Sequence, residues 1–126
     1  MSQYKILVVE DEEMTARLIT YRLKSLGYEV FHEKDGVKGL VAIRKERPDL
    51  VVLDVMLPGL SGFEILQNLQ EDEDFDYGSI KILMLSGKKR AEDVTRGFNL
   101  GAMEYVSKPF KMEEFLLRLN RVLKQG

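Results

Sequence analysis

The sequence predicts an α/β fold in which five parallel strands form one doubly wound sheet with five helices on its two faces. Short apolar runs alternate five times with stretches of helical periodicity, and only a few residues connect them. The runs at 6–9 and 50–53 are apolar throughout, as expected of parallel strands that helices cover on both sides. Parallel strands joined by right-handed crossovers then give helices on both faces of the sheet.

The first two strand-and-helix units occupy the N-terminal part of the chain. The run Ile6–Val9 is a strand that ends in four acids, and the helix after it is closed by Gly27. A less apolar strand follows at Tyr28–His32, and the turn Asp35-Gly36 leads into a helix that stops before Pro48. The apolar stripe expected of the first helix is Leu18, Ile19, Leu23 and Leu26, and one face of the second carries Val37, Leu40, Val41 and Arg44.

The third strand, Leu50–Leu53, is followed at once by Asp54. Ligands of an open parallel sheet bind beyond the carboxyl ends of its strands, so this carboxylate is placed for chemistry. An isolated aspartate at this position is also an ordinary turn residue, and only the other strands can decide between these interpretations. Pro58-Gly59 then turns the chain, and Ser61 can cap a helix from Gly62 to about residue 69.

The C-terminal half supplies the remaining two strands and two helices. The acidic segment 71–76 is predicted to be a solvated loop, and strand Ile80–Leu85 follows it. A helix from about Arg90 to Leu100 is stopped by a glycine, and Met103–Val106 makes a short fifth strand. The last helix buries residues at helical spacing, namely Phe115, Leu116, Leu119, Val122 and Leu123.

Composition limits the function classes. A chain of 126 residues, 44% apolar and 32% charged, is expected to form a single globular domain over residues 1–126. A net charge of −2 does not favour binding to nucleic acid or to an anionic membrane, and the absence of cysteine excludes disulfides and thiol chemistry. No signal-peptide core or membrane-spanning run is present, so a cytoplasmic location is the default expectation.

Polar groups follow four of the predicted strands at the same edge of the sheet: Glu10 and Asp11, Asp54, Ser86 and Lys108. Three carboxylates in one crevice repel one another and stay ionised only when cations accompany them. Lys108 and a divalent ion would meet this need. Because the donors are oxygens, without histidine or cysteine, Mg²⁺ is the expected metal.

Four motifs together resemble the receiver domain of bacterial two-component response regulators: VVEDE at the first strand, LDVMLPGLSG at the third, MLSG at the fourth and GAMEYVSKPF at the fifth. The resemblance runs from Lys5 to Lys124. It implies a flavodoxin-like sheet with strand order 2-1-3-4-5. It also implies a signalling switch that assists its own phosphorylation and dephosphorylation but is not a conventional enzyme.

The resemblance implies a role for each acid. Asp54 matches the phosphoacceptor, which takes a phosphoryl group from a phosphohistidine of a sensor histidine kinase or a histidine phosphotransfer protein. Glu10 and Asp11 match the acidic pair that holds Mg²⁺, with Asp54 and the backbone carbonyl of Met56 as further ligands. Because Glu10 stands where Asp is commoner, its longer side chain leaves open whether it binds the metal directly or through water.

The remaining matches concern the phosphoryl group and the response to it. Lys108 matches the lysine that pairs with phosphate oxygens, and its peptide bond to Pro109 is expected to be cis. Ser86 matches the hydroxyl that bonds the phosphoryl group, and Tyr105 is expected to rotate into space beneath the preceding helix when Ser86 moves. The surface over residues 88–123 would then control an output domain, a downstream protein or a homodimer. Met103-Glu104 and Val94 depart from the pattern of DNA-binding relatives, so their dimer is not implied.

Two other functions compete with the switch. A Mg²⁺-dependent phosphatase of the haloacid dehalogenase kind also uses a strand-end aspartate, but it places a second Asp two positions later, where this chain has Met56. A receiver that binds partners without phosphorylation is the third interpretation, although every key position holds a competent group.

Several conspicuous residues have structural interpretations. Glu12 and Glu13 suit the start of a helix, and Tyr105 alone would be a core aromatic. His32 is placed on the second strand, away from the crevice, and is expected to have no catalytic role. Met14 is either in partial core contact or exposed beside the crevice as part of a kinase-docking face.

Overall fold

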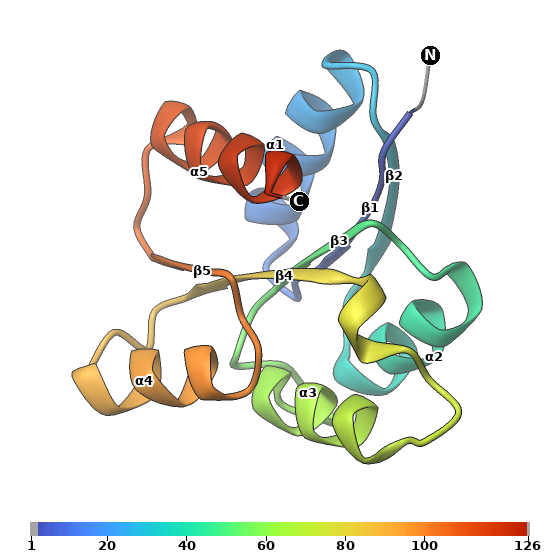
Figure 1. The fold of residues 1–126 in the computed structure, drawn as a ribbon. Helices are drawn as coiled ribbons and strands as arrows, with labels where there is room; N and C mark the ends of the chain where they lie inside the picture. The colour runs from blue at the N-terminus through green and yellow to red at the C-terminus, as the bar shows by residue number, and fades with distance from the viewer. Residues whose placement is uncertain (1–2, 126) are drawn as a thin grey trace.

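The computed structural model describes residues 3–125, over which five strands and five α-helices alternate along the chain (Figure 1). The elements are β1 (Lys5–Val9), α1 (Glu13–Ser25), β2 (Glu29–Glu33), α2 (Gly36–Glu46), β3 (Leu50–Leu53), α3 (Gly62–Glu71), β4 (Lys81–Ser86), α4 (Ala91–Asn99), β5 (Glu104–Ser107) and α5 (Met112–Lys124). A short 3₁₀ helix, η1 (Tyr77–Ser79), precedes β4. None of the described helices has the length and apolar character that crossing a bilayer requires.

The sheet has the order β2-β1-β3-β4-β5, and all of its neighbouring strands are parallel. Helices α1 and α5 cover one face, and α2, α3 and α4 cover the other (Figure 1). The predicted fold class and strand order are therefore confirmed. Since the strands are parallel, their carboxyl ends meet at one edge, where ligand sites form in folds of this kind.

The core consists of two apolar layers, one on each face of the sheet. In β1, Ile6 and Val8 pack toward α1 and α5, whereas Leu7 and Val9 pack toward the other three helices. All four side chains are fully buried, as are their neighbours in β3. This two-sided burial explains why both strands are apolar at every position.

Helix α2 buries only part of the face that was predicted for it. Val37 and Val41 are 53% and 59% exposed, while Gly36 and Gly39 are buried with Leu40. A Cβ on Gly39 would lie 2.7 Å from Cγ1 of Val9, so a glycine here lets the helix lie close to β1. The prediction was wrong for the two valines because apolar periodicity cannot detect a face made partly of glycine.

The stripe predicted for α1 is only partly correct. Ile19 and Leu23 are fully buried, and Ala16 completes their face one turn earlier. Leu18 and Leu26 are more than half exposed because they lie to the side of this face. Both leucines are therefore exposed apolar side chains on the outer side of α1.

The acidic segment between α3 and β4 is anchored rather than simply solvated. Phe75 is buried, and Asp72 accepts a hydrogen bond from Nε of Arg44 at 3.1 Å. The hydroxyl of Tyr77 donates to the carbonyl of Leu100, just after α4. These contacts connect the segment to both α2 and α4, which its composition did not reveal.

Candidate functional site

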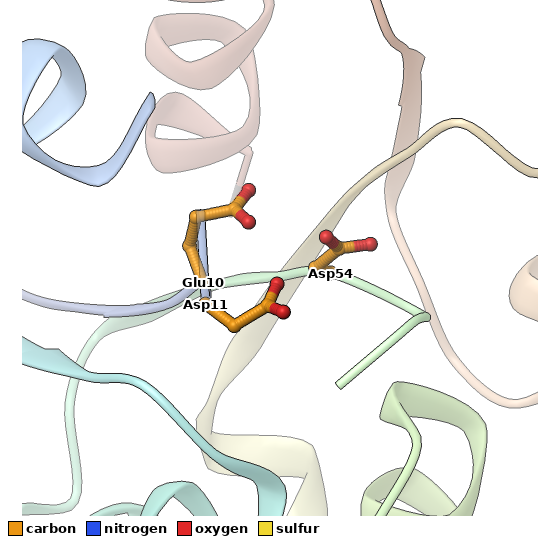
Figure 2. A group of neighbouring side chains, drawn as sticks. All are labelled: Glu10, Asp11 and Asp54. Carbon is orange, nitrogen blue, oxygen red and sulfur yellow. The ribbon is translucent and has the colours of Figure 1, made fainter. Parts of the chain in front are cut away.

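Three carboxylates meet at the carboxyl edge of the sheet. Glu10 and Asp11 follow β1, Asp54 follows β3, and the pairing of Val9 with Leu53 brings the two strand ends level. Figure 2 shows the three carboxylates converging, and one oxygen from each lies within 4.8 Å of the others. The backbone N–H of Asp54 donates to the carbonyl of Val9 at 3.1 Å, which fixes the turn beyond the sheet.

Lys108 supplies a positive charge to this cluster from the segment after β5. Its Nζ lies 2.7 Å from Oε1 of Glu10 and 2.9 Å from Oδ2 of Asp54. Glu10 is 1% exposed and Asp54 5%, whereas Asp11 is exposed. Lys108 therefore compensates two buried carboxylates, and the third faces solvent. Its peptide bond to Pro109 is cis.

Burial and the contacts between their charges shift the pKa values of Glu10 and Lys108. Burial raises the pKa of Glu10 from 4.5 to about 7, although Lys108 acts against this shift. For Lys108, burial alone lowers the pKa, but its contacts with Glu10 and Asp54 outweigh burial and raise it. The lysine is thus held as an ammonium between the two acids.

Backbone groups and neighbouring residues orient the acids. The N–H of Met56 donates to Oδ1 of Asp54 at 3.1 Å, and the N–H of Glu12 donates to Oε2 of Glu10 at 3.0 Å. Glu12 is the N-cap of α1, at the helix start where it was predicted, and its Oε1 also lies 3.9 Å from Nζ of Lys108. The ring Nε2 of His32 lies 2.8 Å from the carbonyl oxygen of Glu10. His32 therefore contacts the acidic turn, whereas its strand position had suggested that it lies away from the crevice.

Helix α3 starts directly beneath Asp54. A Cβ on Gly62 would lie 2.3 Å from the carbonyl oxygen of Asp54, so only glycine allows this approach. Ser61 caps the helix: its Oγ accepts from the N–H of Glu64 at 3.1 Å, and Glu64 accepts from the N–H of Ser61 at 2.9 Å. Ser61 was expected to cap this helix, and the capping box that it forms with Glu64 fixes the loop that leaves the site.

Ser86 and Tyr105 are linked through the backbone of Lys88. Ser86 is fully buried at the end of β4, and its Oγ accepts the N–H of Lys88 at 3.1 Å. The hydroxyl of Tyr105 donates to the carbonyl of the same Lys88. The Tyr105 ring is 6% exposed and packs against Gly97 of α4. The sequence motifs singled out Ser86 and Tyr105 but gave no signal for Lys88 or Gly97.

The donors present suit a hard divalent cation. All three side chains offer carboxylate oxygens, which Mg²⁺ prefers, and the exposed Asp11 leaves one side open to water. Oε1 of Glu10 is buried and has no well-aligned hydrogen bond among the described residues, although the Lys108 ammonium is near it. The cluster can therefore hold a metal ion.

Comparison with known proteins gives one consistent result. The family model "Response regulator receiver domain" matches residues 6–120. The probable transcriptional regulatory protein TcrX of Mycobacterium tuberculosis is 38% identical over 95% of this chain and 50% of its own length. The alkaline phosphatase synthesis transcriptional regulatory protein PhoP of Bacillus subtilis is 40% identical over 97% of this chain and 49% of its own length. This chain thus spans about half the length of these curated relatives.

Solved structures agree with this match. The non-phosphorylated HemR receiver domain from Leptospira biflexa superposes with a TM-score of 0.89 at 35% identity. The superposition covers 98% of this chain and 97% of that one.

Proposed function

This chain belongs to the response regulator receiver domain family, and from this membership we propose that it is a signalling switch that accepts a phosphoryl group on Asp54. The observation that carries the proposal is the position of Asp54, beside two further carboxylates and 2.9 Å from the ammonium of Lys108. A buried carboxylate with a fixed cation beside it is suited to attack phosphorus while the charge on the phosphoryl oxygens is balanced.

We propose that Glu10, Asp11 and Asp54 hold Mg²⁺, with the backbone carbonyl of Met56 as a further ligand. Bound there, Mg²⁺ would neutralise charge on the phosphoryl oxygens during transfer. The oxygen-only donor set and the solvent-facing Asp11 support this assignment. The close contact of Glu10 with Lys108 favours a role in holding the lysine, and metal contact through water then suits its longer side chain.

In the proposed transfer, a carboxylate oxygen of Asp54 forms a bond to phosphorus as the bond from phosphorus to the donor nitrogen breaks. The donor would be a phosphohistidine on a sensor histidine kinase or on a histidine phosphotransfer protein, whose imidazole takes up a proton as it leaves. Lys108 holds its ammonium near the accepting oxygens, and Ser86 offers a hydroxyl to the phosphoryl group. These groups position and compensate charge, and phosphoryl transfer requires little more.

The proposed response begins at Ser86. If its hydroxyl turns toward the phosphoryl group, the N–H of Lys88 loses its acceptor, and the carbonyl of Lys88 that binds Tyr105 is disturbed. The surface of α4, β5 and α5 would change with it. We propose that this surface acts on an output domain, a downstream protein or a second copy of the chain. We also propose that residues 1–126 form one receiver domain.

Intact mass after incubation with Mg²⁺ and acetyl phosphate tests the proposed acceptor. We expect a persistent gain of one phosphoryl group that Asp54→Asn abolishes, because the amide is a far weaker nucleophile. Asp74→Asn, an exposed site in the acidic segment, is the matched control and should behave as wild type. Release of inorganic phosphate without a persistent adduct would instead identify a phosphatase, and no reaction would identify a phosphorylation-independent binding module.

A further inference from the structure

Helix α4 rests on the ring of Tyr105 at a residue without a side chain. A Cβ on Gly97 would lie 2.9 Å from Cδ2 and 3.1 Å from Cε2 of Tyr105. Carbon atoms in ordinary contact lie about 3.5–4.0 Å apart, so a methyl group cannot share this space with the ring. Gly97 is also the residue that α4 buries, which makes this contact central to the packing of the helix.

The ring has no room to retreat inward. Met84 is the partner of Tyr105 in the β4–β5 register and is fully buried. Its Sδ would lie 3.3 Å from the same Cβ on Gly97, and its Cε would lie 3.1 Å from a Cβ on Gly62, beneath Asp54. Met84 therefore fills the inner side of the pocket. A methyl group at position 97 would have to separate the ring from α4.

We infer that Gly97 is a positioning residue for Tyr105: its missing Cβ provides the space that holds the ring between α4 and β5. The hydroxyl of the held ring reaches the carbonyl of Lys88, whose N–H is bound to Ser86. Gly97 thereby sets whether the tyrosine stays linked to the loop that follows Ser86. The consequence for signalling rests on the proposed function, but the steric relation does not.

Gly97→Ala tests this inference because alanine favours a helix more than glycine does and does not itself prevent α4 from forming. The protein is labelled with 3-fluorotyrosine, and the ¹⁹F signal of Tyr105 is assigned by its loss in Tyr105→Phe. A soluble paramagnetic chelate then reports the exposure of the ring. We expect several-fold greater broadening of this signal in Gly97→Ala than in wild type. The ring becomes more exposed whether it turns outward or α4 moves away.

Gly78→Ala is the control, because a Cβ there would make only an ordinary contact, 3.7 Å from a carboxylate oxygen of Asp76. It should leave the Tyr105 signal as protected as in wild type. Equal protection of Tyr105 in Gly97→Ala and wild type would overturn the inference. If Gly97→Ala does not fold, the double variant with Tyr105→Ala decides the matter. A double variant as stable as Tyr105→Ala alone supports the steric conflict, and a double variant clearly less stable than Tyr105→Ala contradicts it.

The outcome is independent of whether Asp54 accepts phosphate. Ring exposure is compared without any phosphodonor, so the inference is judged even if wild type gains no mass from acetyl phosphate. Where phosphate is accepted, the Tyr105 signal of wild type should shift on phosphorylation, and this shift should be diminished in Gly97→Ala. A full wild-type shift in the variant would contradict the role of Gly97 in the switch.

Discussion

The ammonium nitrogen of Lys108 lies 2.9 Å from Oδ2 of Asp54, although the two residues are 54 positions apart in the chain. The same nitrogen lies 2.7 Å from Oε1 of Glu10. The end of β5 is thus electrostatically attached to the ends of β1 and β3. We therefore expect Lys108 to have two roles: it stabilises the fold, and it prepares Asp54 for the proposed phosphoryl transfer.

Replacing Lys108 by methionine should affect both roles. Two buried carboxylates then lose their cation. Because a hydrogen bond to a charged group contributes about 1.5–3 kcal/mol, the free energy of unfolding should fall by about this amount. Phosphate uptake from acetyl phosphate should slow by about 100-fold, because one stabilising donor is missing from the transfer step. Urea unfolding and the rate of mass gain measure the two effects. Lys89→Met, at an exposed position, should change neither the free energy of unfolding nor the rate of phosphate uptake. Phosphorylation of Lys108→Met at the wild-type rate would contradict the assignment.

The raised pKa of Glu10 predicts that stability depends on pH. The unfolded chain loses this proton near pH 4.5, whereas the folded protein keeps it until about pH 7. The folded state therefore binds more protons between these values, and the free energy of unfolding should fall as pH rises from 4.5 to 7. The full shift corresponds to at most about 3 kcal/mol.

Urea titrations between pH 4.5 and pH 8 measure this dependence. Glu10→Gln cannot ionise, so its profile should be flatter over the same range and its stability should exceed that of wild type at pH 8. Mg²⁺ favours the ionised acids and should reduce the fall in wild type. An identical slope for wild type and Glu10→Gln would show that another group is responsible.

The parallel, doubly wound class of the fold could be predicted from the composition of individual strands, whereas the strand order followed from the resemblance to the receiver family. Strands that are apolar throughout can be buried only between two helical layers, and this requirement correctly predicted β1 and β3. Val37 and Val41 of α2 were misplaced because Gly36 and Gly39 form the buried face, and glycine carries no hydropathy signal. The backbones of two elements can approach closely at a glycine because it has no Cβ, and a hydropathy pattern does not register this absence.

The convergence at the site was predictable for a similar reason, since strand ends in a parallel sheet must meet at one edge. The contact of His32 with the carbonyl of Glu10 was not predicted, because the expected strand order places β2 beside β1 but does not give the register that pairs His32 with Val8. The burial of Tyr105 agrees with its interpretation as a core aromatic, but the way the ring is held was not predictable. It depends on Gly97 and on the carbonyl of Lys88, and neither belongs to a recognisable motif.

The capping box of α3 should contribute measurably to stability. Ser61→Ala removes the acceptor for the N–H of Glu64, and loss of a serine cap costs about 1 kcal/mol of the free energy of unfolding. Because α3 starts beneath Asp54, loosening its first turn should also slow phosphate uptake. Chemical unfolding and intact mass measure the two effects. Ser79→Ala, outside α3, is the control for loss of a serine hydroxyl and should leave phosphate uptake unchanged. Wild-type stability in Ser61→Ala would show that the cap is energetically unimportant.

Substitution of Met14 tests whether the phosphodonor protein docks on the outer surface of α1. Its side chain is 67% exposed, near the acidic turn from which α1 begins and on the same helix as the exposed Leu18. Met14→Lys places a charge on this apolar surface and should slow transfer from a phosphorylated histidine kinase that phosphorylates wild type. Its reaction with acetyl phosphate should be unchanged, because that donor needs no docking surface. Val41→Lys is the matched control, since Val41 is 59% exposed on α2, on the opposite face of the sheet. Equal slowing of both variants, or slowing with acetyl phosphate as well, would show that α1 is not the docking face.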